Sequence, residues 1–505
     1  MTQAGSEPAP IERAPVDVQP LPSPSATVKS AVVAVTGLAL FLGFWHLQRR
    51  SFWQDEAYTW STVDRGFPAL VSLLARKEGF QILHSLIEWP TNRLSSTVDA
   101  FRTPSVLAFA AAVPAVWLAG RRLFDERTGL LAALLFALNG FALQFAQQAR
   151  GYMLAAALCA YAGAMLAGHV LSPRKWTRIG WIAFSALAIY AHGFAALGIA
   201  GQVAALWFLP AAKRRELHWL RDVALIGLCA APAILAPLLQ VNSTAVGVIA
   251  KPRVSDLRGL AWSMSGRTGI AVPVIGLGVV IALVTAANRV RHDLHSIDSF
   301  RFALPIFWMI VPAFVLLTVS FVHPIYLERY VVWSVGAVVI LAAYGLTRLG
   351  RLNGYVMPAV VLLAVAVAST GVVRWYRQPP EQDFHSAMSQ LAPRVHAGDA
   401  FIFSPDEVRL PSDFYLRSEA NLDSVIPVYP AAPWGHFKTG DQQVVSIGQA
   451  PISRVLAERY PRVWIVSVAT AGVTAPRVDE LSAEYRVASD HAYGGDVDVM
   501  LLELR

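Results

Sequence analysis

The stretch FWQDEAYTW, residues 52–60, directly follows the first long apolar run and places two carboxylates, Asp55 and Glu56, side by side among aromatic residues. Adjacent side chains on a helix point about 100° apart, so these carboxylates do not share one proton. One of them is free to face a cavity while the other caps the helix or forms an ion pair. A helix N-terminus that acidic residues stabilise is the plainer interpretation of the pair.

The sequence around this stretch has the composition of a polytopic α-helical membrane protein. Of its 505 residues, 55% are hydrophobic and 15% are charged, and the mean hydropathy is +0.46. Blocks of about 20 apolar residues are long enough to cross a bilayer. About eleven transmembrane helices are predicted, the two around His192 being open to interpretation as one long helix. They lie near 30–48, 99–120, 128–149, 152–171, 179–192, 194–210, 222–241, 269–287, 302–322, 330–347 and 355–374.

The basic residues between the spans predict the orientation. Alternate loops hold fifteen Lys and Arg, against six in the intervening loops after residue 120. Since basic loops stay in the cytoplasm, we expect a cytoplasmic N-terminus and a C-terminus outside. The net charge of +8 follows from these loops. We therefore predict membrane lipids, and not nucleic acid, as partners.

Changes in composition predict three parts. Residues 1–29, rich in Pro and Ser, are expected to form a disordered cytoplasmic tail. Residues 30–375 are expected to form the transmembrane domain, whose outer loop 49–98 holds two apolar segments suited to interfacial helices. Residues 376–505 are expected to form an extracytoplasmic α/β domain. Its strand-like runs are AFIFS (400–404), RVWIVSV (462–468) and VDVMLLEL (497–504).

Basic and aromatic residues recur where predicted spans begin on the outer side. Arg150 and Tyr152 lie in LQFAQQARGYM (143–153), and Arg329 and Tyr330 lie in HPIYLERYVVW (323–333). A guanidinium there suits a phosphate through paired hydrogen bonds, while anchoring of the helix end is the plainer interpretation.

Two further features are candidates for the same site. His192 is an ionisable residue well inside an apolar run, suited either to a polar contact at a helix bend or to lining a cavity. Lys251 and Arg253 begin an outside loop that also contains Arg258 and Arg267, which suits lipid phosphate or anionic lipid. The sequence contains no GxxxxGK[ST], no GxGxxG after a strand and no HExxH. The energy for any reaction is therefore expected to come with the substrate.

Taken in order, four segments resemble the GT-C superfamily of integral-membrane glycosyltransferases, in the branch of protein O-mannosyltransferases and the aminoarabinose transferase of lipid A. The segments are DEAYTW (55–60), RTPSVLAFAAAVPAVWLAGRRLF (102–124), ALNGFALQFAQQARGYML (137–154) and ERY (328–330). The resemblance covers most of the first 375 residues. It implies a GT-C-like transmembrane domain.

The resemblance also implies roles for residues. It makes Asp55 the catalytic base, with Glu56 beside it, and gives Arg150 with Tyr152 and Arg329 with Tyr330 to the donor's phosphate. Lys251 and Arg253 are further phosphate candidates. His192 and His84 are the candidates for the acceptor cavity. His84 lies in GFQILHSL (79–86), where the branch usually has a Pro-Pro-Leu-Tyr-like segment, so the identity of the acceptor is open.

The expected function is transfer of mannose or an arabinose-type pentose from a polyprenyl-phosphate donor, with inversion, on the outer face of a bacterial plasma membrane. The acceptor is a hydroxyl of a glycan, glycolipid or protein of the cell envelope. A divalent metal ion held by Glu56 would assist the phosphate, but nothing in the sequence requires a cofactor. A transporter or lipid flippase is the alternative. Nearly uncharged spans and the lack of an internal repeat count against it.

Overall fold

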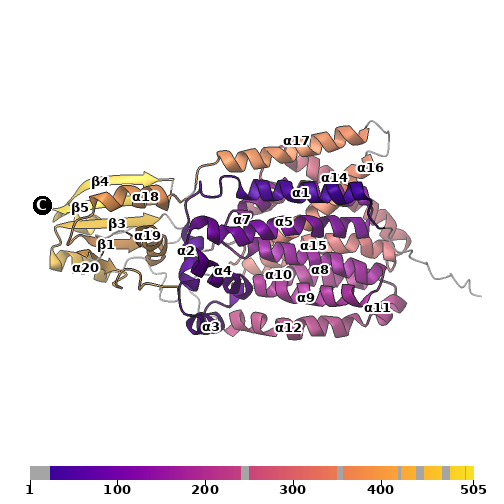
Figure 1. Ribbon diagram of the computed structural model, residues 1–505, viewed down its shortest axis with the longest axis horizontal. Helices are drawn as coiled ribbons and strands as arrows, with labels where there is room; N and C mark the ends of the chain where they lie inside the picture. The colour runs from indigo at the N-terminus through magenta and orange to yellow at the C-terminus, as the bar shows by residue number, and fades with distance from the viewer. Residues whose placement is uncertain are drawn as a thin grey trace, which may run out of the picture.

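The computed structural model describes residues 23–239, 249–349, 356–380, 382–418, 422, 424–439, 449–468, 478–494 and 496–505. It consists of a long bundle of helices with a small sheet domain at one end (Figure 1). The predicted polytopic helical fold with a C-terminal α/β domain is confirmed. Most of the predicted N-terminal tail lies outside the described residues.

Within the described ranges, eight helices are long and apolar enough to cross a membrane. They are α1 (Ala26–Phe44), α5 (Val98–Leu123), α8 (Tyr152–Leu171), α12 (Trp219–Leu239), α14 (Ala271–His292), α15 (Ile297–Ser320), η4 with α16 (Glu328–Leu349) and α17 (Val356–Arg377). A bent pair, α6 (Glu126–Ala137) and α7 (Gly140–Ala146), meets at 58° and counts as a ninth span if taken together.

Two shorter helices complete the set of predicted spans. They are α9 (Lys175–Ala191) and α10 (Ala195–Ala204), the latter continued by η2 (Ala205–Phe208). His192 lies between them in an extended conformation, so this pair is two helices rather than one. Each of the eleven predicted spans thus corresponds to a helix or helix pair. A short helix, α11 (Ala211–Leu217), turns the chain at the end of the bundle opposite the sheet domain (Figure 1).

The bundle has a buried centre and an apolar outer layer. In α8 and in η4 with α16, 83% and 94% of the apolar stretch is buried, against 22% in α1, α12 and α17. The outer helices expose large apolar side chains such as Phe41, Leu228 and Leu362, which suits contact with lipid. At the centre, α14 and α16 touch backbone to backbone, because a Cβ on Gly345 would lie 1.9 Å from the Gly278 carbonyl oxygen.

Three helices from the long loop after α1 lie between the bundle and the sheet domain (Figure 1). They are α2 (Gln54–Val63), α3 (Phe67–Arg76) and α4 (Ile82–Leu94), with the 3₁₀ turn η1 (Gly79–Gln81) before α4. Another helix, α13 (Val254–Met264), precedes α14 at the same end. The segments predicted to lie outside therefore gather at the end of the bundle that carries the sheet domain.

The C-terminal domain holds a five-stranded mixed sheet in the order β2-β1-β3-β5-β4. The strands are β1 (Ala400–Ser404), β2 (Ile426–Tyr429), β3 (Arg462–Val468), β4 (Tyr485–Tyr493) and β5 (Val497–Leu504). β1 pairs in parallel with β2 and β3, while β5 runs antiparallel to β3 and β4. The helices of this domain are α18 (Phe384–Leu391), α19 (Arg409–Leu416) and α20 (Gln449–Glu458).

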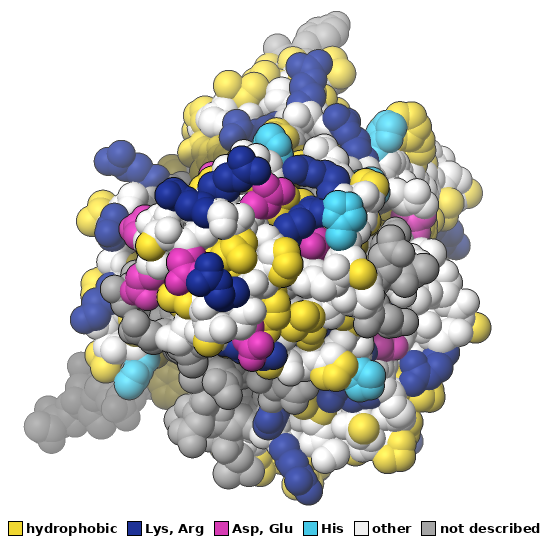
Figure 2. Space-filling model, turned by 90° about the vertical axis from the view of Figure 1, so that its left-hand side faces the viewer, with side chains coloured by type: hydrophobic (Ala, Val, Ile, Leu, Met, Phe, Trp, Pro, Cys, Tyr) yellow, Lys and Arg dark blue, Asp and Glu magenta, His cyan; other side chains and the backbone are white. Residues whose placement is uncertain are grey.

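The three predicted strands are the three central ones, β1, β3 and β5. The prediction missed β2 and β4, which are the edges of the sheet. β4 is largely exposed and shows no apolar run, while β2 is only four residues long and contains Pro427, a residue that is rare in strands. Viewed from this end of the molecule, the surface carries charged side chains of both signs among apolar ones (Figure 2).

Candidate active site

The first turn of α2 presents the two adjacent carboxylates in different directions. Trp53 caps the helix in an extended conformation, and its backbone N–H donates to Glu56 Oε2 at 3.4 Å. Acidic residues in a first turn are stabilised by the positive end of the helix dipole. The structure thus contains the cap that the plainer interpretation of the pair requires.

Glu56 is completely buried and paired. Its Oε2 lies 2.6 Å from Arg102 Nη2, and its Oε1 accepts from Arg102 Nε at 2.8 Å and from the Ala149 backbone N–H at 2.8 Å. The remaining donors of Arg102 reach the backbone carbonyl oxygens of Leu47 (2.7 Å), Arg50 (3.0 Å) and Ser51 (3.0 Å). All five N–H donors of this guanidinium are therefore used. Glu56 and Arg102 fix the chain that leads into α2.

Asp55 lies at the edge of the bundle with 26% of its side chain exposed. Its Oδ2 is 3.3 Å from Nη1 of Arg329, which belongs to η4. Arg150 holds the same turn from another side, because its Nη1 donates to the Asp55 carbonyl oxygen and to Thr59 Oγ1, both at 3.2 Å. Three elements that are far apart in the sequence thus meet at Asp55, Arg329 at its carboxylate and Arg150 at its backbone.

Aromatic rings line the floor beneath these two arginines. The Arg150 guanidinium lies 5.9 Å from the Tyr152 ring, and that of Arg329 lies 5.6 Å from the Tyr330 ring. His192 is packed among Tyr152 (5.2 Å), Trp333 (5.2 Å) and Tyr330 (5.6 Å), measured between ring centroids. The predicted site residues Arg150, Tyr152, His192, Arg329 and Tyr330 are therefore brought together.

His84 lies on α4, on the other side of the segment that carries Arg150. It is buried, with Nε2 3.7 Å from Glu88 Oε1. Burial, and then the positive charge of Arg150, lowers the pKa of His84 to about 3, so this imidazole is neutral at physiological pH. At Gly151 an added Cβ would lie 2.5 Å from the Ala191 carbonyl oxygen and 3.2 Å from His84 Cβ, so only glycine fits between them.

Lys251 and Arg253 lie apart from this cluster. Both side chains are exposed, and the Arg253 backbone N–H donates to Asp256 Oδ2 at the start of α13. Among the contacts of the described residues, none joins either side chain to Asp55 or Glu328, the two carboxylates at the site. The basic residue that approaches the site from this loop is Arg267 instead. Its Nη2 lies 3.4 Å from Glu328 Oε2, and its Nη1 donates to Gln144 Oε1.

The sequence contained a signal for Arg267. Like Arg150 and Arg329, it directly precedes an apolar span on the side of the sheet domain. It also follows Gly266, and both residues have positive φ angles, of 62° and 93°, so the chain turns sharply there. A position directly before a span thus indicated which basic residue of this loop approaches the site better than the number of basic residues nearby did.

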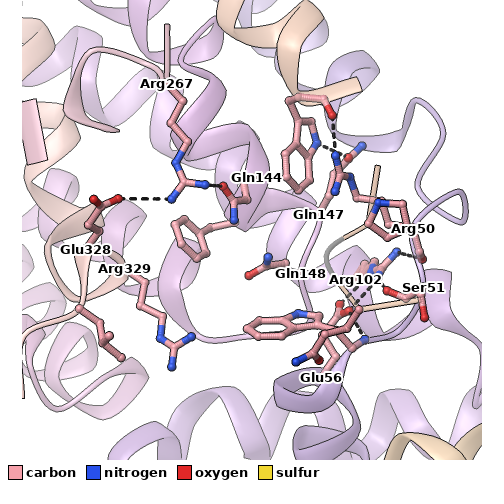
Figure 3. A pocket seen from close by; sticks show the side chains of 16 residues that line it. Arg50, Ser51, Glu56, Arg102, Gln144, Gln147, Gln148, Arg267, Glu328 and Arg329 are labelled. Atoms are coloured by element: carbon pink, nitrogen blue, oxygen red, sulfur yellow. Dashed lines mark hydrogen bonds and ion pairs between the residues drawn. The ribbon is translucent and has the colours of Figure 1, made fainter. Parts of the chain in front are cut away.

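A cavity of about 240 Å³ opens beside Arg329 (Figure 3). Its lining includes four arginines (Arg50, Arg102, Arg267, Arg329), four glutamines (Gln144, Gln147, Gln148, Gln382) and two glutamates (Glu56, Glu328). Arg102 is saturated by other groups, and Arg50 Nη2 donates to the carbonyl oxygens of Trp375 (2.6 Å), in α17, and of Gln378 (2.8 Å), directly after it. Arg267 and Arg329 are the two guanidiniums on the side of Glu328 (Figure 3). The cavity is suited to an anionic group.

The donor set does not fit a divalent metal ion. Among the described residues, no group of three or more His, Cys, Asp or Glu side chains gathers in a way that would hold a metal. Glu56, the ligand considered from the sequence, directs both carboxylate oxygens at Arg102 and at backbone N–H groups. No step proposed below uses a metal.

Solved structures of other membrane proteins share this architecture. ArnT from Cupriavidus metallidurans aligns over 94% of this chain and 98% of its own, with a TM-score of 0.60 and 14% identity in the apo state. The structure of the same protein bound to undecaprenyl phosphate aligns over the same shares of both chains, with a TM-score of 0.59 and 15% identity. The apo oligosaccharyltransferase of Archaeoglobus fulgidus aligns over 87% of this chain and 69% of its own, with a TM-score of 0.55 and 10% identity.

These structures are GT-C membrane glycosyltransferases, and the chain has their fold, as the sequence predicted. No protein-family model and no curated protein sequence matches the chain. At 10–15% identity, the likeness concerns the fold.

Proposed function

We propose that the protein is a glycosyltransferase that moves a sugar from a polyprenyl-phosphate carrier to an acceptor hydroxyl. The observation that carries the proposal is the position of the Asp55 carboxylate, 3.3 Å from Arg329, whose guanidinium lines a basic cavity. A carboxylate suits proton removal from a hydroxyl, and adjacent guanidiniums suit a phosphate leaving group. The shared fold supports the same carrier, since one ArnT structure holds undecaprenyl phosphate and one archaeal structure holds dolichol-phosphate with a peptide.

The reaction is a direct displacement. The acceptor oxygen attacks the anomeric carbon of the sugar while Asp55 takes the proton from that oxygen. The bond between the anomeric carbon and the phosphate oxygen breaks, and the polyprenyl phosphate leaves with the bonding electrons. Attack from the face opposite the leaving group inverts the anomeric centre. The charge that develops on the phosphate is compensated by Arg329 and Arg267, which line the cavity.

Arg150 has two functions in this proposal. Its hydrogen bonds to the Asp55 carbonyl oxygen and to Thr59 hold the turn that presents the base. Its positive charge, above the Tyr152 ring, also adds to the field that attracts the donor's phosphate. His192, packed against Tyr152, and His84, packed against Gly151, are the candidates for contact with the acceptor. The sugar is a hexose such as mannose or an arabinose-type pentose, and the acceptor belongs to the cell envelope.

The test is single-turnover transfer by the purified protein in lipid nanodiscs, with a panel of radiolabelled polyprenyl-phosphate sugars. Transfer from at least one donor to a hydroxyl-bearing acceptor, with release of polyprenyl phosphate, is the expected result. Movement of a lipid across the bilayer with no change in the sugar–phosphate bond for any donor would instead identify a flippase.

The orientation has its own test. We propose that the end of the bundle with the sheet domain faces the outside, because the opposite loops carry the excess of Lys and Arg. A reporter enzyme that is active only outside the cytoplasm should work when fused after Arg505 and fail when inserted within residues 213–221. The reverse pattern would place the site on the cytoplasmic side and contradict the proposed reaction.

A further inference from the structure

The helix that carries Asp55 begins at a residue that is a poor cap. Trp53, the N-cap of α2, has a side chain with no oxygen to accept a hydrogen bond. The first N–H groups of a helix have no partner within the backbone of the helix, so their acceptors must come from elsewhere. Glu56 accepts from the Trp53 N–H. The N–H groups on either side of it, those of Phe52 and Gln54, donate to the C-terminal domain.

Gln382, in the segment between α17 and α18, supplies the acceptor for the first residue of α2. Its Oε1 accepts from the Gln54 backbone N–H at 3.1 Å, and its Nε2 donates to the Gln54 side-chain oxygen at 3.4 Å. Gln382 also lines the cavity beside Arg329. One side chain from the C-terminal part of the protein thus contacts the first turn of α2 and forms part of the cavity wall.

A second pair of contacts lies directly before α2. The hydroxyl of Tyr415, on α19, accepts from the Phe52 backbone N–H at 2.6 Å. In the other direction, Ser51 Oγ accepts at 3.0 Å from the backbone N–H of His385, in the first turn of α18. The chain that enters α2 and the first helix of the C-terminal domain therefore satisfy each other's N–H groups.

The C-terminal domain also contacts the rest of α2. Phe414 of α19 stacks on Phe52 with ring centroids 4.4 Å apart and meets Trp60 edge-on at 5.4 Å. The Thr439 backbone N–H donates to Ser61 Oγ at 2.8 Å, in the last turn of the helix. These later contacts hold the body of α2, whereas those of Gln382 and Tyr415 hold its start.

Asp55 lies between two groups that fix its backbone. Arg150 donates to the Asp55 carbonyl oxygen, and Gln382 accepts from the N–H of the preceding residue, Gln54. Helix ends fray, and more so where their N–H groups lack partners. Loss of the Gln382 acceptor therefore frees the turn before Asp55, and the carboxylate is no longer held 3.3 Å from Arg329.

We infer that the C-terminal domain caps α2 from outside the helix, with Gln382 as a positioning residue that fixes the turn that presents Asp55. The effect on turnover rests on the proposed function, whereas the capping itself does not. Proton removal requires the base to be held in a defined geometry toward the hydroxyl. The donor's phosphate is assigned to Arg267 and Arg329, which belong to other elements. Loss of the cap therefore lowers kcat and leaves the donor KM unchanged.

The first experiment compares steady-state kinetics of two variants at Gln382. Gln382→Met keeps the length of the side chain and removes both hydrogen bonds, so kcat should fall about 3- to 10-fold with the donor KM unchanged. Gln382→Glu keeps an acceptor for the Gln54 N–H, so kcat should return to near the wild-type value. Its negative charge lines the cavity, so the donor KM should rise.

Gln390→Met, at an exposed glutamine of α18, is the matched control and should behave as wild type. A Gln382→Met enzyme with the wild-type kcat would overturn the inference. It would also be overturned if Gln382→Glu were as slow as Gln382→Met, because an acceptor at this position would then have no effect.

The second experiment does not depend on activity. Hydrogen–deuterium exchange of the full-length protein in nanodiscs, followed by mass spectrometry, reports on the start of α2. In Gln382→Met, the peptide that spans residues 52–57 should exchange about 3- to 10-fold faster than in wild type. Tyr415→Phe removes the acceptor of the Phe52 N–H and should have the same effect. Tyr493→Phe, which removes a hydroxyl that donates to Gln390 on the surface, is the control and should have none.

Wild-type exchange at the start of α2 in Gln382→Met, or in Tyr415→Phe where Gln382→Met does not fold, would overturn the inference. If wild type transfers no sugar from any donor while the exchange behaves as expected, the proposed function fails and the capping of α2 by the C-terminal domain stands.

Discussion

Asp55 and Glu56 are consecutive residues, yet their side chains belong to regions that differ in burial, partners and openness. We call Glu56, Arg102 and the Ala149 backbone the anchor, and Asp55, Arg329 and Arg267 the rim. In the anchor the carboxylate is completely buried and its partner guanidinium uses every donor. At the rim the carboxylate has a single cation at 3.3 Å and is 26% exposed. A saturated ion pair fixes position, whereas an unsaturated one leaves the base available to a substrate.

The largest effect is expected at the rim, from Asp55→Asn. The amide keeps the shape of the side chain but does not take a proton, so transfer should fall about 10²–10⁴-fold with donor affinity and thermal stability retained. Single-turnover rates, together with a donor-binding titration, are the measurement. Asp293→Asn, at an exposed carboxylate just after α14, is the matched control and should transfer at the wild-type rate. Wild-type turnover by Asp55→Asn would show that the base lies elsewhere.

In the anchor, the same kind of substitution should damage stability rather than chemistry. Glu56→Gln leaves the buried Arg102 guanidinium without its counter-charge, which typically costs about 3–5 kcal/mol. We expect a lower Tm and a lower yield of folded protein. The double variant Glu56→Gln with Arg102→Met should recover part of this loss, since no unpaired charge remains. If Glu56→Gln instead folds normally and loses all transfer, the two carboxylates have exchanged roles.

Donor binding separates the arginines of the rim from the basic residues outside it. Loss of a charged hydrogen bond to phosphate costs about 1.5–3 kcal/mol, so Arg329→Ala and Arg267→Ala should each lower kcat/KM roughly 10- to 100-fold. Lys251→Ala and Arg253→Ala, at exposed positions of the same loop as Arg267, should stay within about 2-fold of wild type. Steady-state kinetics at varied donor concentration will measure kcat/KM for each of these variants. Larger losses at Lys251 and Arg253 would assign the phosphate to these further candidates from the sequence.

The smallest effect is expected where the rim meets the C-terminal domain. Gln54→Ala removes the side-chain hydrogen bond to Gln382 and should lower kcat about 3- to 10-fold. Because both residues act on the same turn, Gln54→Ala and Gln382→Ala together should cost little more than either alone. Gln390→Ala, at an exposed glutamine of α18, is the control. Strictly additive losses would mean that the two residues act by separate routes.

The sequence predicted most of the bundle end of the site. Asp55 was found because an acidic pair among aromatic residues follows the end of the first apolar span, and Arg150 and Arg329 because each lies next to the start of another span; these patterns depend on local sequence. All such starts on one side of the bundle meet at the same end, so local patterns were enough to bring them together.

Two parts of the site were outside the reach of that reasoning. Lys251 and Arg253 were chosen for the basic character of their loop. The direction in which the basic side chains of this loop point depends on the turn at Gly266 and Arg267, and composition does not reveal that turn. Gln382 lies more than 300 residues from α2, in a domain for which the sequence predicted only strands and helices. Its contact with Gln54 depends on tertiary packing, which also places α19 against Phe52 and Trp60.

The separation between α2 and its outer supports also bears on synthesis. Gln54 and Gln382 are 328 residues apart, so at about 5–20 residues per second roughly 16–66 s pass between them on the ribosome. Arg102 and Ala149 emerge early in that interval, while the residues that hold the outer side of α2 emerge last. A nascent chain halted before residue 382 therefore inserts its spans and pairs Glu56 with Arg102, yet carries an unfinished site. If the proposed function holds, the site is complete only when the C-terminal residues have been synthesised.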